Sequence, residues 1–166
     1  MTLCAGLVDR TLPTIKGNIH LCPLDAQEHD YGFRLPEQDM LWDTGAQQTF
    51  ITEELLSTKD QEYIHDPKYD HYRIGNRLRL QMEAYIGLSN TAILIAAIVV
   101  IVPKLQMPNE FVGVILGQSF CFDRLAYRSI PRRILKARRE DVAEDVWGDI
   151  IMDEYLDEGE NLVKFE

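Results

Sequence analysis

The sequence predicts a single, mainly β domain, and three stretches carry that prediction. Residues 77–83 alternate strictly between polar and apolar side chains, which is the period of a half-buried strand. Residues 92–102 are wholly apolar and end at Pro103, and residues 111–116 are an apolar strand that Gly117 closes. A chain of 166 residues with 46% hydrophobic content can bury one core but is too short for two lobes of ordinary size.

The first part of the chain has two further segments of strand character. Residues 15–22 alternate well enough to predict a first strand. Apolar residues then lead into Asp43 and a strong turn signal, after which residues 49–56 resume as a strand or a short helix. Residues 1–13 show no strong periodicity and are predicted to be an N-terminal extension.

The middle of the chain is predicted to be a polar connection followed by a hairpin. Residues 57–71 are polar and contain Pro67, so we expect an exposed connection. Residues 77–86 and 92–102 then form two strands joined by a turn at 87–90. The first strand should be exposed on one face, whereas the second should be covered on both.

The C-terminal part is predicted to be helical. Residues 118–127 can form a short helix, and residues 142–155 place apolar side chains at helical spacing among acids. That second pattern predicts an amphipathic helix docked on a surface, with a partly disordered acidic tail as the alternative. The expected organisation is an extension over 1–13, a domain over 14–135 and a basic-then-acidic extension over 136–166.

The net charge of −10 is concentrated at the C-terminal end. Of the 27 acidic residues, 11 lie within 140–166, where Lys164 is the one base, so the rest of the chain is neutral. Such asymmetry is typical of a solvated appendage or a partner-binding segment. A basic run precedes it, made of Arg124, Arg128, Arg132, Arg133, Lys136, Arg138 and Arg139.

Several function classes are poorly supported. The three cysteines and four histidines lack the spacing of a zinc site or a disulfide framework, so we expect neither a metal nor an organic cofactor. Residues 92–102 are too short to cross a bilayer, and residues 1–10 lack the pattern of a signal peptide. We therefore expect no membrane partner and a cytoplasmic or nuclear location, or an internal piece of a longer polyprotein.

Asp43 is the strongest candidate for a catalytic residue in the sequence. It stands on a sharp Asp-Thr-Gly turn at the end of an apolar strand, which is an unusual context for a carboxylate. The triplet alone is common in surface turns, where Asp bonds its own loop and Gly accepts positive φ. The apolar residues before it place this acid at the boundary of the core.

A second motif makes the pattern specific. Val114 and Ile115 precede Leu116-Gly117, about seventy residues after Asp43. In order and spacing, the two motifs resemble the retropepsin-like aspartic proteases of retroviruses and retrotransposons, including fungal retroelements, over residues 15–133. The resemblance implies a closed, barrel-like subunit with one short helix, in which Asp43 is catalytic. It also implies support beneath the catalytic loop from Ile115, Leu116, Gly117 and Gln118.

The same resemblance implies a homodimeric endopeptidase. One carboxylate cannot be both the base that deprotonates water and the acid that protonates the scissile carbonyl, and this chain carries one Asp-Thr-Gly. A second copy must therefore supply the other Asp43, and the two close carboxylates would share one proton. No covalent intermediate forms, and the substrate is a peptide or a polyprotein.

The resemblance assigns roles to neighbouring residues as well. Thr44 would brace the two loops across the two-fold axis, and Gly45 would let backbone approach the substrate. A hairpin flap would cover the bound peptide with its tip near residues 73–76. The site residues implied are the loop Thr44, Gly45 and Ala46, and the substrate-binding Gln47, Arg73, Ile74, Gly75 and Asn76.

Two positions depart from the family pattern. Viral members have an acid in the place of Gln47 and an arginine in the place of Gln118, and these two residues pair. Losing both partners together avoids an unpaired charge, and two amides can still hydrogen-bond. This departure keeps an alternative function possible: a weakly active or inactive dimer that serves as a peptide-binding or regulatory module. Nucleic-acid binding by the basic run ranks well below both, because the following acids can neutralise it.

Overall fold

The computed structural model describes residues 2–7, 13–24, 32–74, 79–89, 94–107, 112–118, 125–138 and 146–154. In these ranges the strands are β1 Thr2–Leu7, β2 Pro13–Cys22, β3 Phe33–Trp42, β4 Phe50–Thr52, β5 Arg73–Ile74, β6 Arg79–Leu88, β7 Leu94–Val102, β8 Val114–Leu116, β9 Leu125–Pro131 and β10 Val146–Glu154. The helices are α1 Thr58–Ile64 and α2 Arg132–Arg138, with the 3-10 turns η1 Glu53–Leu55, η2 Pro67–Tyr72 and η3 Lys104–Gln106.

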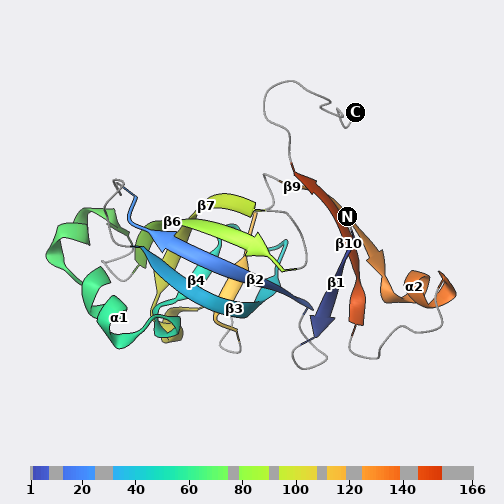
Figure 1. The fold of residues 1–166 in the computed structure, drawn as a ribbon, viewed down its shortest axis with the longest axis horizontal. Helices are drawn as coiled ribbons and strands as arrows, with labels where there is room; N and C mark the ends of the chain where they lie inside the picture. The colour runs from blue at the N-terminus through green and yellow to red at the C-terminus, as the bar shows by residue number, and fades with distance from the viewer. Residues whose placement is uncertain are drawn as a thin grey trace, which may run out of the picture.

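Six of the strands close into a barrel. They follow the order β6-β7-β4-β8-β3-β2, and β2 closes the ring because it pairs with both β3 and β6 (Figure 1). Most neighbours are antiparallel, but β3 runs parallel to β8 and β4 runs parallel to β7. The prediction of a mainly β chain with a closed barrel is therefore confirmed.

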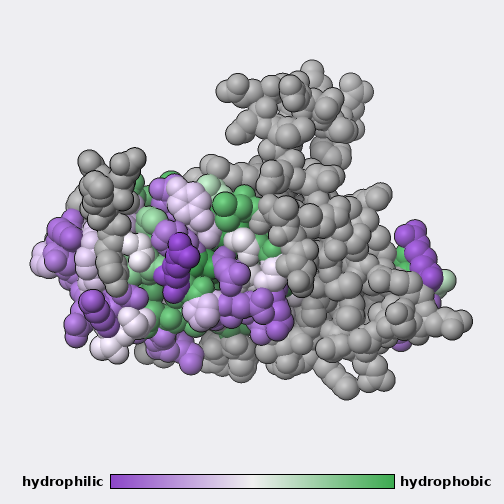
Figure 2. All heavy atoms as spheres, viewed as in Figure 1, coloured by the Kyte–Doolittle hydropathy of each residue, from purple (hydrophilic) through white to green (hydrophobic). Residues whose placement is uncertain are grey.

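The barrel interior is the main core of the protein. Strand β6 alternates as predicted, with Leu80, Met82, Ala84, Ile86 and Leu88 buried. Strand β7 is buried on both faces near its end, because Val99 joins the interior while Val100 and Val102 join a second apolar cluster outside the barrel. Polar side chains cover most of the end of the molecule that carries α1 (Figure 2).

A smaller sheet lies beside the barrel. Strand β10 pairs antiparallel with β1 on one side and with β9 on the other (Figure 1). It is linked to the barrel where Gly6 and Leu7 of β1 pair with Thr14 and Pro13 of β2. The first and last of the described strands are thus joined in one sheet, which the sequence patterns did not predict.

The connection predicted over 57–71 is mostly exposed or half-buried, as expected, but its helical form was not predicted. Ser57 caps α1 by accepting a hydrogen bond from the Asp60 N–H at 3.1 Å, and Asp66 caps η2 by accepting from the Lys68 N–H at 3.0 Å. Ile64 and Tyr69 are buried against the barrel. Two buried side chains and two caps are enough to hold this mostly polar segment in helical form.

The predicted C-terminal helices are also wrong where the structure describes them. Residues 125–127 begin β9, while residues 119–124 lie outside the described ranges. Residues 146–154, expected to be helical, form β10. The apolar residues at 146, 147, 150 and 151 fit a helical period, but β10 gains backbone pairing on both sides, and pairing overrides propensity here. The boundary placed after residue 135 lies inside α2, and the three-part organisation stays a prediction.

The strand predictions hold more closely. Residues 15–22, 77–86 and 92–102 correspond to β2, β6 and β7, with shifts of a few residues at their ends. Strand β3 is ten residues long, whereas the sequence marked only its last two residues before Asp43. Among the residues described, no helix has the length and apolar character needed to cross a membrane.

Candidate active site

Asp43 stands on a loop that spans the end of β8. Strand β8 lies between β3 and β4, with Trp42 opposite Leu116 and Phe50 opposite Ile115. The chain therefore leaves β3, arches over the end of β8 through residues 43–49 and returns as β4. This arrangement brings the two motifs of the sequence, Asp43 and Leu116-Gly117, side by side.

Backbone hydrogen bonds fix the start of this loop. The Asp43 N–H donates to the Leu116 carbonyl at 3.2 Å, and the Ala46 N–H donates to the Asp43 carbonyl at 3.2 Å, which closes a tight turn. The Gly45 N–H donates to Asp43 Oδ1 at 3.0 Å. Asp43 is half-buried, whereas Thr44 and Gly45 at the tip are exposed. The carboxylate is thus held in one orientation at the surface of the single chain.

Gly117 packs directly beneath the loop. A Cβ atom added at this position would lie 2.5 Å from the Gln48 carbonyl carbon, closer still to its oxygen, and 3.0 Å from the Ala46 oxygen. These neighbours are backbone atoms, which cannot swing away as the end of a side chain could. The position therefore has space for a glycine alone, as expected of a residue that packs beneath the Asp43 loop.

Gln118 holds the other side of the loop through two hydrogen bonds. Its N–H donates to the Ala46 carbonyl at 2.8 Å, and its side-chain Nε2 donates to the Thr44 carbonyl at 2.5 Å. The side chain thus binds the loop backbone rather than Gln47, which is exposed. Ile115 and Leu116 are fully buried, so the support beneath the loop is apolar.

Thr49 is a site residue that the sequence patterns missed. It is fully buried, and its Oγ1 accepts a hydrogen bond from the Gly117 N–H at 3.0 Å. This bond joins the two ends of the site, because Thr49 closes the Asp43 loop and Gly117 closes β8. Its sequence signal was only a threonine at the start of an apolar strand, which is common in β proteins.

The residues predicted to form the flap begin in the short strand β5. Arg73 and Ile74 pair with Leu80 and Arg79 as the antiparallel β5 and β6, and residues 75–78 between these strands lie outside the described ranges. Strand β6 lies across the barrel ring from β8, the strand beneath the Asp43 loop. Of the predicted contacts, Gly75 and Asn76 lie outside the described residues.

The two flap residues that are described differ in where they point. Ile74 is 37% exposed. The Arg73 side chain is only 6% exposed and donates to the carbonyl of Ile64, the last residue of α1, at 2.6 Å. Its guanidinium also lies 3.4 Å from His65 Nδ1 and 3.8 Å from Asp70 Oδ1. Arg73 therefore anchors the base of the flap to the helical segment.

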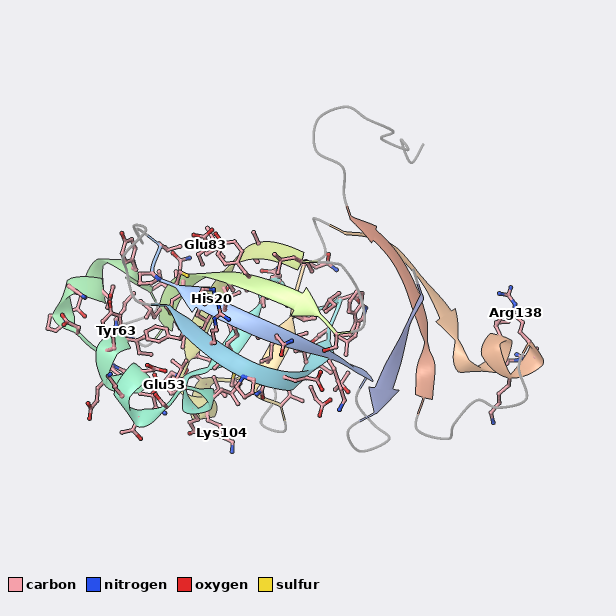
Figure 3. The ribbon with its side chains drawn as sticks, viewed as in Figure 1. His20, Glu53, Tyr63, Glu83, Lys104 and Arg138 are labelled. Carbon is pink, nitrogen blue, oxygen red and sulfur yellow. The ribbon has the colours of Figure 1, made fainter. Side chains whose placement is uncertain are left out.

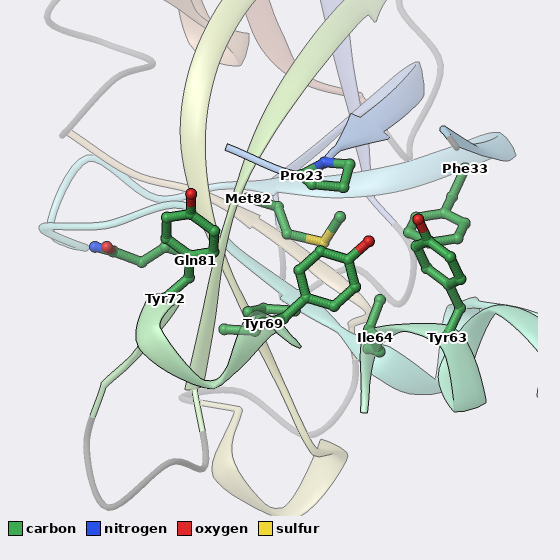
Figure 4. Close-up of a pocket in the computed structure, with 9 residues that line it drawn as sticks. Pro23, Phe33, Tyr63, Ile64, Tyr69, Tyr72, Gln81 and Met82 are labelled. Carbon is green, nitrogen blue, oxygen red and sulfur yellow. The ribbon is translucent and has the colours of Figure 1, made fainter. Parts of the chain in front are cut away.

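A small aromatic cavity lies at that base and is separate from Asp43. It is lined by Pro23, Phe33, Tyr63, Ile64, Tyr69, Tyr72, Leu80, Gln81 and Met82 (Figure 4). Lys68 Nζ lies 4.7 Å from the Tyr63 ring centre and 4.9 Å from that of Tyr69. Burial, followed by the hydrogen bond with Tyr63, raises the pKa of Tyr69 to about 12. The Tyr69 hydroxyl is thus neutral at physiological pH.

Other chemistry has little support in the described residues. Cys22 Sγ lies 3.8 Å from His20 Nε2, but burial and the charge of Glu83 raise the pKa of the thiol, which favours the unreactive protonated form. No group of His, Cys, Asp and Glu in the described ranges could hold a metal ion. Within the basic run, α2 exposes several cations, and Arg138 lies at the opposite end of the molecule from Tyr63 (Figure 3).

No protein-family model matches this sequence, and no curated protein matches it. Function must therefore be inferred from the residues of the site and their geometry.

Proposed function

We propose that this protein is a retropepsin-like aspartic endopeptidase that acts as a homodimer. The observation that carries the proposal is the Asp43 loop, whose backbone is fixed to β8 while its carboxylate and tip remain accessible. A carboxylate held in one orientation on a rigid support is what general acid and base catalysis requires. The adjoining Leu116-Gly117 packs beneath this loop, as the resemblance to the retropepsin family implies.

The chemistry requires a second carboxylate, and a second chain would supply it. Hydrolysis needs one group to take a proton from water and another to give a proton to the scissile carbonyl. The exposed Thr44 and Gly45 leave the loop tip free to meet its copy across a two-fold axis. Two Asp43 side chains would then share one proton and hold the attacking water between them.

The hairpin of β5 and β6 also supports the proposal of an endopeptidase. Its strand β6 faces β8 across the ring, and we propose that this hairpin covers the bound peptide. A closed hairpin excludes water and offers backbone groups to an extended substrate. The substrate class is therefore an extended peptide or an unfolded segment of a polyprotein.

The test compares wild type with Asp43→Asn on a library of unstructured peptides between acidic and neutral pH. Asparagine keeps the size of the side chain but removes the ionisable carboxyl group. We expect wild type to cut a subset of peptides and D43N to cut none of them. If wild type cuts nothing that D43N leaves intact, the protease proposal fails. Peptide binding without cleavage would then support the rival, a dimeric binding or regulatory module.

A further inference from the structure

We propose that the Gln118 carboxamide is a positioning residue that holds the Asp43 loop in its working shape through an uncharged hydrogen bond. The consequence is that the loop keeps this shape at both acidic and neutral pH. The inference rests on the proposed function, because it assigns to Gln118 a role in placing the catalytic carboxylate. It concerns a side chain that touches the loop backbone rather than the substrate.

The geometry around Gln118 carries the first step. Its backbone N–H binds the Ala46 carbonyl and its side-chain Nε2 binds the Thr44 carbonyl, at 2.8 Å and 2.5 Å. One residue therefore holds two carbonyls on either side of Gly45, whose N–H binds Asp43 Oδ1. If the side-chain bond is lost, the Thr44 peptide can rotate, and this rotation moves the neighbouring Gly45 N–H away from the carboxylate.

The chemistry of the surrounding bonds carries the second step. Among the described residues, the bonds within 43–49 and from 43–49 to 116–118 join carbonyls, N–H groups, a threonine hydroxyl, a carboxamide and the Asp43 carboxylate. Asp43 is the one ionisable side chain in this set. The charged groups recorded on the adjoining elements are engaged elsewhere. Glu53 and Glu54 of η1 lie 3.2 Å from His65 and 4.0 Å from Lys104, and Arg79 of β6 lies 5.8 Å from the Phe50 ring centre.

A support without ionisable groups suits an aspartic protease. A clamp made from a carboxylate and a base would weaken as the pH fell toward the carboxylate pKa, near the range where such enzymes work. A carboxamide keeps its donor at every such pH. Activity should therefore follow the ionisation of the Asp43 pair alone, without a second loss at low pH from a loosened loop.

The test replaces the donor by a group whose donor depends on pH. In Gln118→Glu, the protonated carboxyl group can donate to the Thr44 carbonyl. The ionised carboxylate can only accept hydrogen bonds, so it cannot bind this carbonyl oxygen. With an ordinary glutamate pKa of about 4.3, the ratio of Q118E to wild-type kcat should fall by about tenfold between pH 3.5 and pH 6.5. Gln118→Ala should lower kcat by a similar factor at both pH values.

Gln38→Glu is the matched control. Gln38 Nε2 also donates to a backbone carbonyl, that of Pro36 at 3.1 Å, but on β3 away from the loop. The ratio for Q38E should not change with pH. If the Q118E ratio is as flat as that of Q38E, or if Q118A retains full kcat, the role assigned to Gln118 is wrong.

Hydrogen exchange separates this inference from the proposed function. Protection of the amides of residues 43–49, relative to wild type at the same pH, should fall in Q118E at pH 6.5 and recover at pH 3.5. This readout needs no cleavage of a substrate. Protection that follows the pH in this way, in a protein that cuts no peptide, would refute the proposed protease activity but support the role assigned to Gln118. If protection in Q118E equals that in wild type and the protein is an active protease, only the role assigned to Gln118 is refuted.

Discussion

The Asp43 loop and the base of the flap are held in different ways. The loop is fixed by backbone and uncharged side-chain bonds to β8, above a glycine that has no room for a side chain. The base of the flap is fixed by the guanidinium of Arg73, which reaches the end of α1 and lies near Asp70 and His65. One part depends on close packing, and the other depends on charged groups near the surface.

The difference indicates which part stays fixed and which part can move. Close-packed backbone has no second arrangement of similar energy, so the loop should keep Asp43 in place throughout a catalytic cycle. A flap must open and close, and a charged side chain that binds a helix end can act as its anchor. Single substitutions in each region test this difference between the loop and the flap.

The largest effect is expected from Gly117→Ala. The new methyl group would overlap the Gln48 carbonyl, and relief requires backbone movement in the loop or in β8. We expect a loss of about 3 kcal/mol or more in the free energy of unfolding, measured by chemical denaturation. Gly87→Ala is the control, since its Cβ would lie 3.8 Å from Leu94 Cδ1 in ordinary contact. Equal stability of the two variants would contradict the packing assigned to Gly117.

Two threonines of one segment offer the next test. Thr49→Val removes the acceptor of the buried Gly117 N–H and should cost about 1–3 kcal/mol of unfolding free energy. Thr52 is also buried, but its Oγ1 has no hydrogen-bond partner among the described residues. Thr52→Val should therefore be neutral or stabilising by about 1 kcal/mol. Urea titrations of both variants measure the difference, and a larger loss in T52V would reverse the assignment.

A smaller effect is expected at the base of the flap. Arg73→Met keeps much of the side-chain volume but leaves the Ile64 carbonyl without its donor, at a cost of about 1–2 kcal/mol in unfolding free energy. The same change in the exposed Arg34 should cost much less. In the active dimer, R73M should raise KM more than it lowers kcat, because it loosens the flap and leaves Asp43 in place. A variant with lowered kcat and unchanged KM would contradict the separation of the two regions.

The smallest effect concerns Tyr69 and is confined to alkaline pH. Burial raises its pKa to about 12, above the unfolded value of about 10, so the folded chain retains the proton longer than the unfolded chain. The stability from this difference is fully present below pH 10 and is lost between pH 10 and 12. Tyr69→Phe should flatten that decline in thermal unfolding. An equally steep decline in Y69F would show that other groups cause it.

The barrel was predictable from the sequence because its strands carry local signals. Strands β6 and β7 alternate or are wholly apolar, and the Asp43 and Gly117 motifs lie at the ends of apolar runs. The helical segment before the flap was missed because two buried side chains, Ile64 and Tyr69, are too few to give a period. The C-terminal strands were missed because β10 is stabilised by pairing with β1, more than a hundred residues away in sequence.

The site was predictable only in part for a similar reason. Asp43 and Leu116-Gly117 could be paired because their order and spacing resemble those of the retropepsin family, and the structure brings them together. The roles of Thr49 and Arg73 depend on distances across the fold, to Gly117 and to Ile64, which no local pattern encodes. Gln118 was expected to interact near Gln47, but its partner is the Thr44 carbonyl.

In the proposed enzyme each active site contains an Asp43 from both chains, and subunit mixing shows whether it does. Wild-type and D43N chains are unfolded together, refolded at defined ratios and assayed on a peptide that wild type cuts. If one intact carboxylate is not enough, activity follows the square of the wild-type fraction, so an equal mixture retains a quarter of it. Activity that falls in simple proportion to the wild-type fraction would show that a single chain carries a complete site.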